Sequence, residues 1–291
     1  RGPRLLADTP ESGEEKIARA QGAQVIINTR GVVTWREEMR QLPNLKMIAT
    51  CSIGTDMIDL EIARDLGIVV SNQPGRTAPV VAEHMFGLMF ALSKRAYFQT
   101  AELKAGRWTR MMNTMLQGKV LGVVGTGAIG VEMACLARAI GMEVIAWTFN
   151  PSPERAAEYG VRFVELDELL QQSDVVSLHV KLTEDSRHLI GARELGLMKE
   201  GALLLNGARG DVLHIDALRA SLLGGHIGGA GLDVFPEEPL PADHPILECD
   251  QVVLTPHAAD QTLEGVDLLN EGAVNNVIAF LEGRPQNNVA V

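Results

Sequence analysis

The sequence predicts an α/β protein with two domains, each built on a doubly wound parallel sheet. Short β-branched runs alternate with helical stretches along the whole chain, which is typical of parallel sheets with crossover helices. The 291 residues correspond to two domains at about 150 residues per domain. A glycine-rich turn at residues 125–130 stands between a strand and a helix and indicates a Rossmann-type second domain.

The first domain is predicted from three strands, at residues 24–28, 45–50 and 68–71. A helix at 58–65 connects the last two strands and ends before Gly67, a glycine placed as a helix C-cap. A long apolar helical pattern follows at 78–97, and we expect it to bridge the two domains. The first domain is therefore expected to be a parallel α/β domain.

The second domain begins with a strand at 119–124 and a helix at 131–140. Further strands are predicted at 143–147, 175–179, 202–206, 226–232 and 252–255. An apolar helix at 264–281 closes the chain, and we expect it to pack back on the first domain. The predicted substrate domain is therefore discontinuous, 1–92 plus 263–291, and the dinucleotide-binding domain is 93–262. Because the chain opens at Arg1 in mid-pattern, we expect N-terminal residues to be missing from it.

Composition excludes several classes of function. The chain has 26 basic and 37 acidic residues, a net charge of −11, which disfavours binding to nucleic acid or to anionic lipid. No apolar run is long enough to span a membrane. The three cysteines are scattered and form no CxxC pair (Cys51, Cys135 and Cys249). We therefore expect neither a disulfide framework nor a zinc site, and we expect a cytoplasmic location.

The glycine-rich turn predicts a dinucleotide site. Gly125 allows the tight turn, Gly127 lets the backbone approach a pyrophosphate, and Gly130 lets helix and strand pack closely. The N–H groups at the helix start then face the anion. The cofactor-binding residues predicted here are Gly125, Gly127, Ala128, Ile129 and Gly130.

The end of the next strand bears on the choice between NAD and NADP. An acidic residue for an NAD ribose is expected there, but the chain has Thr148 and Asn150 with no carboxylate between them. Its absence removes the repulsion against a 2′-phosphate, and Ser152 and Arg155 offer further contacts. We predict NAD or NADP as the cofactor, with NADP slightly favoured.

Polar residues follow three later strands of the same predicted sheet. Arg209 comes after the strand at 202–206, Asp233 and Glu238 follow the next strand, and His257 follows the last. Because the carboxyl ends of parallel strands face the ligand crevice, these side chains are predicted to meet beside the nicotinamide. Taken singly, an Arg after a strand is usually part of a surface ion pair, and a His in such a turn is more often structural than catalytic. Only the joint placement of these residues indicates a site.

Each residue type suits hydride transfer to a 2-keto acid. The Arg209 guanidinium can bind a carboxylate in a bidentate way and polarise the keto oxygen. His257 can donate a proton to the forming alkoxide, and Glu238 on the other ring nitrogen favours the imidazolium. Asp233 is predicted to accept a hydrogen bond from the nicotinamide carboxamide.

These motifs resemble the D-isomer-specific 2-hydroxyacid dehydrogenases, which include glyoxylate/hydroxypyruvate reductases and phosphoglycerate dehydrogenase. The spacing from Arg209 to His257 is similar to the family's. The matching stretches, beside the glycine turn, are CSIGTD at 51–56, SNQPG at 71–75, VAEH at 81–84, HVKLT at 179–183, NGARG at 206–210, LDVF at 232–235 and TPH at 255–257. Lys181 departs from the family's usual Pro, and Ala259–Asp260 from a small Gly or Ser. The resemblance also implies that the first domain is a flavodoxin-like substrate domain, which is expected to lack its N-terminal strand and helix here.

The resemblance implies roles for these motifs. It implies that Arg209, Glu238 and His257 are catalytic and that Thr77 lies near the nicotinamide. The substrate carboxylate would be bound by Ser52, Ile53, Gly54 and Arg209, and the cofactor would also be lined by His179, Val180, Asn206 and Ala208. Family members usually form homodimers, so a homodimer is expected.

The predicted function is reduction of a small 2-keto acid to a 2-hydroxy acid, with glyoxylate or hydroxypyruvate preferred. Arg30 and Arg76 are candidate contacts for a distal anionic group on the substrate. Two alternatives stay open: an NAD(H)-sensing protein similar to the C-terminal-binding-protein corepressors, and phosphoglycerate dehydrogenase. Formate dehydrogenases of the same fold carry Gln where Glu238 stands, which argues against that activity.

Overall fold

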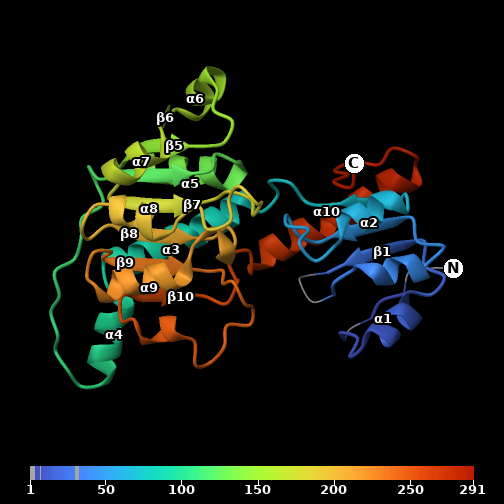
Figure 1. Ribbon diagram of the computed structural model, residues 1–291, viewed down its shortest axis with the longest axis horizontal. Helices are drawn as coiled ribbons and strands as arrows, with labels where there is room; N and C mark the ends of the chain where they lie inside the picture. Colours follow the sequence, from blue (N-terminus) through green and yellow to red (C-terminus); the bar gives the residue numbers. More distant parts are fainter. Residues whose placement is uncertain (1–3, 7, 30–32) are drawn as a thin grey trace. The chain divides into compact units, whose positions relative to one another are not determined.

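The computed structural model describes residues 4–6, 8–29 and 33–291. It divides into two compact units, Arg1–Thr77 with Thr262–Val291 and Ala78–Gln261, which we call the small unit and the large unit. Each contains a parallel sheet with helices on its faces (Figure 1). The predicted α/β class is therefore confirmed.

The large unit is a seven-stranded parallel sheet with the order β10-β9-β8-β7-β4-β5-β6. The strand order reverses between β4 and β7, where the doubly wound architecture places its ligand crevice. The strands are β4 (Val120–Val124), β5 (Glu143–Trp147), β6 (Arg162–Phe163), β7 (Val175–Leu178), β8 (Leu203–Asn206), β9 (Gly229–Leu232) and β10 (Val252–Leu254). The two-residue edge strand β6 was not predicted, because it is too short to show a period-2 pattern.

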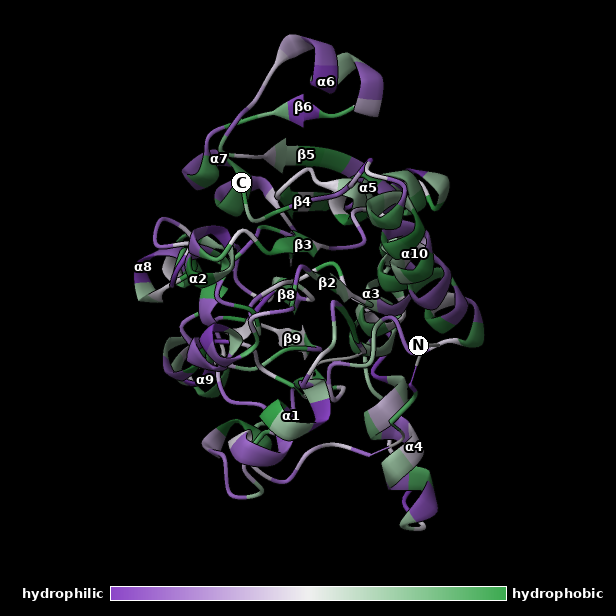
Figure 2. Ribbon diagram, turned by 90° about the vertical axis from the view of Figure 1, so that its right-hand side faces the viewer, coloured by the Kyte–Doolittle hydropathy of each residue, from purple (hydrophilic) through white to green (hydrophobic). Residues whose placement is uncertain are grey.

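Helices cover both faces of this sheet (Figure 1). One core packs α7, α8 and α9 against the sheet, and the other packs α3 and α5 against the opposite face. Hydrophobic colour dominates β5, whereas α6 is mostly hydrophilic (Figure 2). The helical segments are α5 (Ala128–Ala139), α6 (Pro153–Tyr159), α7 (Leu166–Gln172), α8 (Ala192–Leu197), α9 (Ile215–Leu223) and the 3-10 turns η2 (Gly210–Val212) and η3 (Pro245–Glu248).

The long helix predicted at 78–97 is two helices, α3 (Ala78–Ser93) and α4 (Ala96–Lys104). The break falls at Arg95, whose φ of 47° is left-handed and cannot continue an α-helix. Moreover, α3 packs on α5, β8 and β9, so the compact units divide after Thr77 rather than after residue 92. The apolar residues of α3 are therefore part of the large unit's core.

The small unit holds a three-stranded parallel sheet of order β1-β2-β3. Helix α10 packs on one face through Leu269 and Ala273, and Met39 and Ile62 lie in the core of the other face. Helix α10 packs on β1 and β2, which confirms the prediction that the C-terminal helix packs back on the first domain. The elements are α1 (Gly13–Ala20), β1 (Val25–Asn28), η1 (Glu37–Gln41), β2 (Met47–Thr50), α2 (Leu60–Asp65), β3 (Val69–Ser71) and α10 (Leu263–Leu281).

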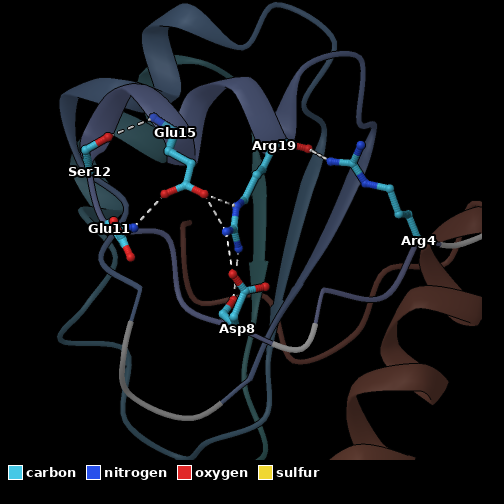
Figure 3. Close-up of polar contacts among 6 residues, drawn as sticks. All are labelled: Arg4, Asp8, Glu11, Ser12, Glu15 and Arg19. Carbon is cyan, nitrogen blue, oxygen red and sulfur yellow. Dashed lines mark hydrogen bonds and ion pairs between the residues drawn. The ribbon is translucent and has the colours of Figure 1, made fainter.

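An ion-pair network holds the segment that precedes α1 (Figure 3). The Arg19 guanidinium, near the end of the helix, donates to Asp8 Oδ2 at 2.7 Å and to Glu15 Oε1 from Nε at 3.0 Å. Ser12 caps the helix by accepting from the Glu15 backbone N–H, and Arg4 donates to the Arg19 carbonyl. These contacts attach a polar stretch to the surface of the small unit.

Within the part of the chain that the structure describes, no helix combines the length and the apolar character that crossing a bilayer requires. The same residues gather no group of three or more His, Cys, Asp or Glu side chains suited to holding a metal ion.

Candidate active site

The glycine turn after β4 is built as a cradle of backbone. Gly125 has a φ of 99°, and a Cβ at Gly130 would lie 2.0 Å from the Gly125 carbonyl oxygen. A Cβ at Gly127 would instead meet nothing within 4 Å, so the chain leaves open space beside the start of α5. Gly127 is the N-cap of that helix and has no side-chain cap. These features fit a dinucleotide whose pyrophosphate approaches the backbone at Gly127.

Arg155 ties the glycine turn to the loop after β5. Its guanidinium donates to the Thr126 carbonyl at 2.7 Å, to Thr126 Oγ1 at 2.9 Å and to the Asn150 carbonyl at 2.9 Å. Ser152 accepts from the Arg155 backbone N–H and caps α6. Arg155 and Ser152 therefore hold the loop that contains Thr148, in addition to any contact with a ribose phosphate.

His179 follows β7 and lies against the glycine turn. A Cβ at Gly125 would lie 2.8 Å from the His179 carbonyl carbon and from Val180 Cγ1. The His179 Nε2 atom pairs with Ser177 Oγ at 2.7 Å, and its Nδ1 is buried without a hydrogen-bond partner among the described residues. Burial lowers the pKa of His179 from 6.5 to about 4, so the ring is neutral at physiological pH.

The turn after β8 presents Arg209. The Asn206 side chain braces it by donating to the Arg209 carbonyl at 2.9 Å and accepting from the Ala208 N–H at 3.0 Å. Gly210 packs so tightly on the next turn that a Cβ there would lie 1.9 Å from the Phe235 carbonyl carbon. The turn that carries Arg209 therefore packs directly against the one that leads to Glu238.

Glu238 and His257 form a hydrogen-bonded pair. His257 Nδ1 lies 2.7 Å from Glu238 Oε2, while Glu238 Oε1 accepts from the Phe235 N–H at 2.9 Å. This pairing raises the pKa of His257, against the lowering effects of burial and of the positive charge of Arg209. For Glu238, burial raises the pKa, but the bonds from His257 and Phe235 outweigh it and the net pKa is lowered. The arrangement therefore favours a protonated imidazole beside a carboxylate.

Asp233 holds the turn that carries His257. Its Oδ1 accepts from Thr255 Oγ1 at 2.6 Å and from the Ala258 N–H at 2.8 Å, and its Oδ2 accepts from the Ala259 N–H at 3.0 Å. The residue is 1% exposed. Both carboxylate oxygens therefore bind the 255–259 turn, and the predicted bond from Asp233 to the nicotinamide carboxamide stays a prediction.

The substrate-binding residues predicted in the small unit lie in the loop that follows β2. Ser52 Oγ donates to the Gly54 carbonyl at 2.7 Å, and the Asn72 side chain donates to the Ile53 carbonyl at 2.8 Å. Thr77, at the end of the small unit, is buried. The approach of these residues to His257 stays a prediction.

The structure describes only one of the two arginines that are candidates to bind a distal anionic group of the substrate. Arg30 lies outside the described residues. Arg76 is held on α10, where its Nη1 donates to the Leu268 carbonyl and to Glu271 Oε2, both at 3.1 Å. Its charge is therefore already paired within the small unit.

Comparison with known proteins identifies the family. The model of the D-isomer specific 2-hydroxyacid dehydrogenase NAD-binding domain matches residues 86–259. The chain belongs to this dehydrogenase family. A glyoxylate reductase of Korarchaeum cryptofilum is 36% identical over 282 residues, covering 95% of this chain and 85% of the relative. A hydroxypyruvate reductase of Thermotoga maritima is 41% identical over 239 residues, covering 78% and 76%.

Solved structures give the same result for this 2-hydroxyacid dehydrogenase. A D-lactate dehydrogenase of Aquifex aeolicus, complexed with NAD and lactic acid, has a TM-score of 0.83 and 34% identity, covering 92% of this chain and 86% of that one. An acyclic imino acid reductase complexed with NADPH and D-Arg has a TM-score of 0.86 and 29% identity, covering 96% and 89%. Similar proteins thus bind NAD or NADPH, and this chain is an NAD(P)-dependent member of the dehydrogenase family.

Two residues of the dehydrogenase site received no role from the sequence. Thr255 donates to Asp233, and His84 on α3 lies 3.0 Å from the Thr255 hydroxyl through its Nε2. His84 belongs to the matching stretch at 81–84 and is a polar residue in an apolar helix. That contrast was the only available signal, and it does not say which partner the imidazole meets.

Proposed function

We propose that this dehydrogenase reduces glyoxylate or hydroxypyruvate to the corresponding 2-hydroxy acid. The observation that carries the proposal is the His257–Glu238 pair beside Arg209, because it combines a proton donor with a cation suited to a carboxylate. The glyoxylate and hydroxypyruvate reductases among the relatives support the choice of small substrates.

The three residues act on the carboxylate and on the keto group of the substrate. Arg209 binds the substrate carboxylate and polarises the keto oxygen. When bound, NAD(P)H supplies the hydride that reduces the carbonyl carbon. His257 donates its Nε2 proton to the oxygen as negative charge develops there, and Glu238 keeps the Nδ1 proton in place and stabilises the imidazolium. In the oxidative direction the neutral imidazole takes the proton from the hydroxyl group.

A panel of 2-keto acids against both reduced cofactors tests the proposal. We expect loss of nicotinamide absorbance with glyoxylate or hydroxypyruvate, and a lower kcat/KM with phenylpyruvate and with 3-phosphohydroxypyruvate. Preference for the phosphorylated acid would identify a phosphoglycerate dehydrogenase instead. Cofactor binding without turnover of any keto acid would favour a nucleotide sensor.

For the cofactor, NADP is proposed as slightly preferred over NAD. The loop after β5 has Thr148 and Asn150 and no carboxylate, and the Arg155 guanidinium lies at the same loop. A Thr148→Asp variant should lose kcat/KM with NADPH by about tenfold or more and keep most of its activity with NADH, because the new charge repels a 2′-phosphate. A wild-type enzyme with a strong preference for NADH would contradict this part of the proposal.

We also propose a homodimer in a reducing cytoplasm. The segment from α4 onward exposes Leu103, Trp108, Met112 and Met115, with Trp108 83% and Met112 92% exposed, and a second copy of the chain would cover this apolar surface. The thiols of Cys51, Cys135 and Cys249 form no disulfide, which suits a reducing compartment. Sedimentation of the wild type and of Trp108→Ser with Met112→Ser measures the first point, since the double variant should be monomeric.

A further inference from the structure

The imidazole of His84 on α3 meets the two strand ends that carry the proton-donor turn. Its Nε2 lies 3.0 Å from Thr255 Oγ1 and 3.5 Å from Asp233 Oδ1. The side chain of His84 is 24% exposed and that of Asp233 only 2%. All three residues belong to the large unit. Among the hydrogen bonds of the described residues, this contact alone links α3 to the 255–259 turn.

The direction of the hydrogen bonds follows from the groups present. Asp233 is a carboxylate and only accepts, so the hydroxyl of Thr255 donates to its Oδ1 at 2.6 Å. A hydroxyl has a single proton, and Thr255 therefore meets His84 as an acceptor. His84 must carry its proton on Nε2, and the chain runs from His84 Nε2–H to the Thr255 hydroxyl and on to Asp233.

Asp233 in turn fixes the backbone of the His257 turn. Besides its side-chain bonds to the Ala258 and Ala259 N–H groups, the Asp233 carbonyl accepts from the His257 N–H at 2.8 Å. His257 has a φ of 50°, a left-handed conformation that a non-glycine residue holds only when its surroundings impose it. The orientation of the His257 ring therefore depends on the orientation of the Asp233 carboxylate.

We propose that His84 is a positioning residue for His257, acting through the Thr255 hydroxyl and the Asp233 carboxylate. The inference rests on the proposed function, because it assigns His84 to the same proton-transfer step. His84 does not touch the reacting atoms. It fixes where the 255–259 turn places the imidazole against Glu238, and a misplacement of about 1 Å at such a group costs up to about 10²-fold in rate.

A matched pair of variants separates this role from simple packing. The amide nitrogen of Gln reaches the place of the imidazole Nε2, whereas Asn is one methylene too short. We expect His84→Asn to lower kcat about tenfold and to lower the pKa of His257 as the pairing with Glu238 loosens. His84→Gln should restore both. The readouts are keto-acid turnover and NMR titration of the histidine rings without cofactor.

Three further measurements complete the test. Thr255→Val should reproduce the effect of His84→Asn, and adding the two changes together should lower kcat little further, because both break one chain. Glu83→Gln, on the exposed side of α3, should leave both readouts unchanged.

The proposal is overturned if His84→Asn keeps the wild-type kcat and His257 pKa, if Gln and Asn act alike, or if the His84 and Thr255 effects add. The titration of His257 is independent of turnover. A wild type without keto-acid activity would therefore refute the proposed function while the titration still decides the role of His84.

Discussion

Two regions at the same edge of the seven-stranded sheet are built in opposite ways. The turn after β4 offers backbone alone, with three glycines and the uncapped start of α5. The turns after β8, β9 and β10 offer side chains, Arg209, Glu238 and His257, each braced by further hydrogen bonds. A backbone site does not titrate and fails when an added atom clashes within the turn or blocks the ligand, whereas a side-chain site depends on the protonation and position of each group. The two regions should therefore fail differently when mutated.

The largest expected effect is the loss of the proton donor. His257→Asn should lower kcat for keto-acid reduction by about 10²–10⁴-fold, since proton transfer by a positioned group contributes that much. Dissociation constants for NADH and NADPH, measured by fluorescence titration, should stay within about twofold because the glycine turn is untouched. A variant with near-normal kcat would refute the role of His257.

The next effect comes from the neutral histidine beside the glycine turn. The pKa of His179 is about 4 in the folded protein and 6.5 in a model peptide, so the unfolded chain binds the extra proton as pH falls between these values. The contribution of His179 to the free energy of unfolding should therefore be constant above about pH 6.5, and it should fall by roughly 3 kcal/mol on acidification towards pH 4.

His179→Gln keeps a group within reach of Ser177 and cannot ionise in this range. Its unfolding free energy, measured by urea denaturation across the same pH range, should lack this part of the slope. Equal slopes for the wild type and the variant would contradict the assignment of acid sensitivity to His179.

Substitutions at two glycines of the turn should separate an effect on protein stability from an effect on cofactor affinity. Gly130→Ala places a Cβ 2.0 Å from the Gly125 carbonyl oxygen, and we expect it to destabilise the protein by about 1–3 kcal/mol, as overpacking does. Gly127→Ala meets open space and should keep the melting temperature, yet its methyl group would occupy the approach of the pyrophosphate and weaken both cofactors. Normal cofactor affinity of Gly127→Ala would show that the pyrophosphate does not lie there.

The smallest effect is a shift in pH dependence. Reduction needs the protonated imidazole, so its kcat/KM falls as pH rises through the pKa of His257, which Glu238 raises. In Glu238→Gln this pKa should drop, and the fall in activity should move to lower pH. Glu237→Gln, at the exposed neighbouring position, is the control. An unchanged profile in Glu238→Gln would remove Glu238 from the relay.

The sequence was most informative where one contiguous stretch defines the structure. The strand, the glycine turn and the helix at 119–140 were predicted within three residues, because the chemistry of the turn is local. The meeting of Glu238 with His257 also followed, since parallel strands bring their carboxyl ends to one edge. The helix at 78–97 was wrong as a single element, because the left-handed Arg95 carries no sequence signal.

The sequence by itself determined the fold class, the family and the residue types that carry the chemistry, because periodicity and short motifs are properties of neighbouring residues. Only the tertiary structure decided the partners of buried polar groups. It shows that Asp233, whose predicted cofactor contact stays a prediction, also braces the His257 turn, and that His84 contacts Thr255. Both contacts join residues more than twenty positions apart. A buried hydrogen bond is chosen by what lies nearest in space, and one sequence does not encode that distance locally.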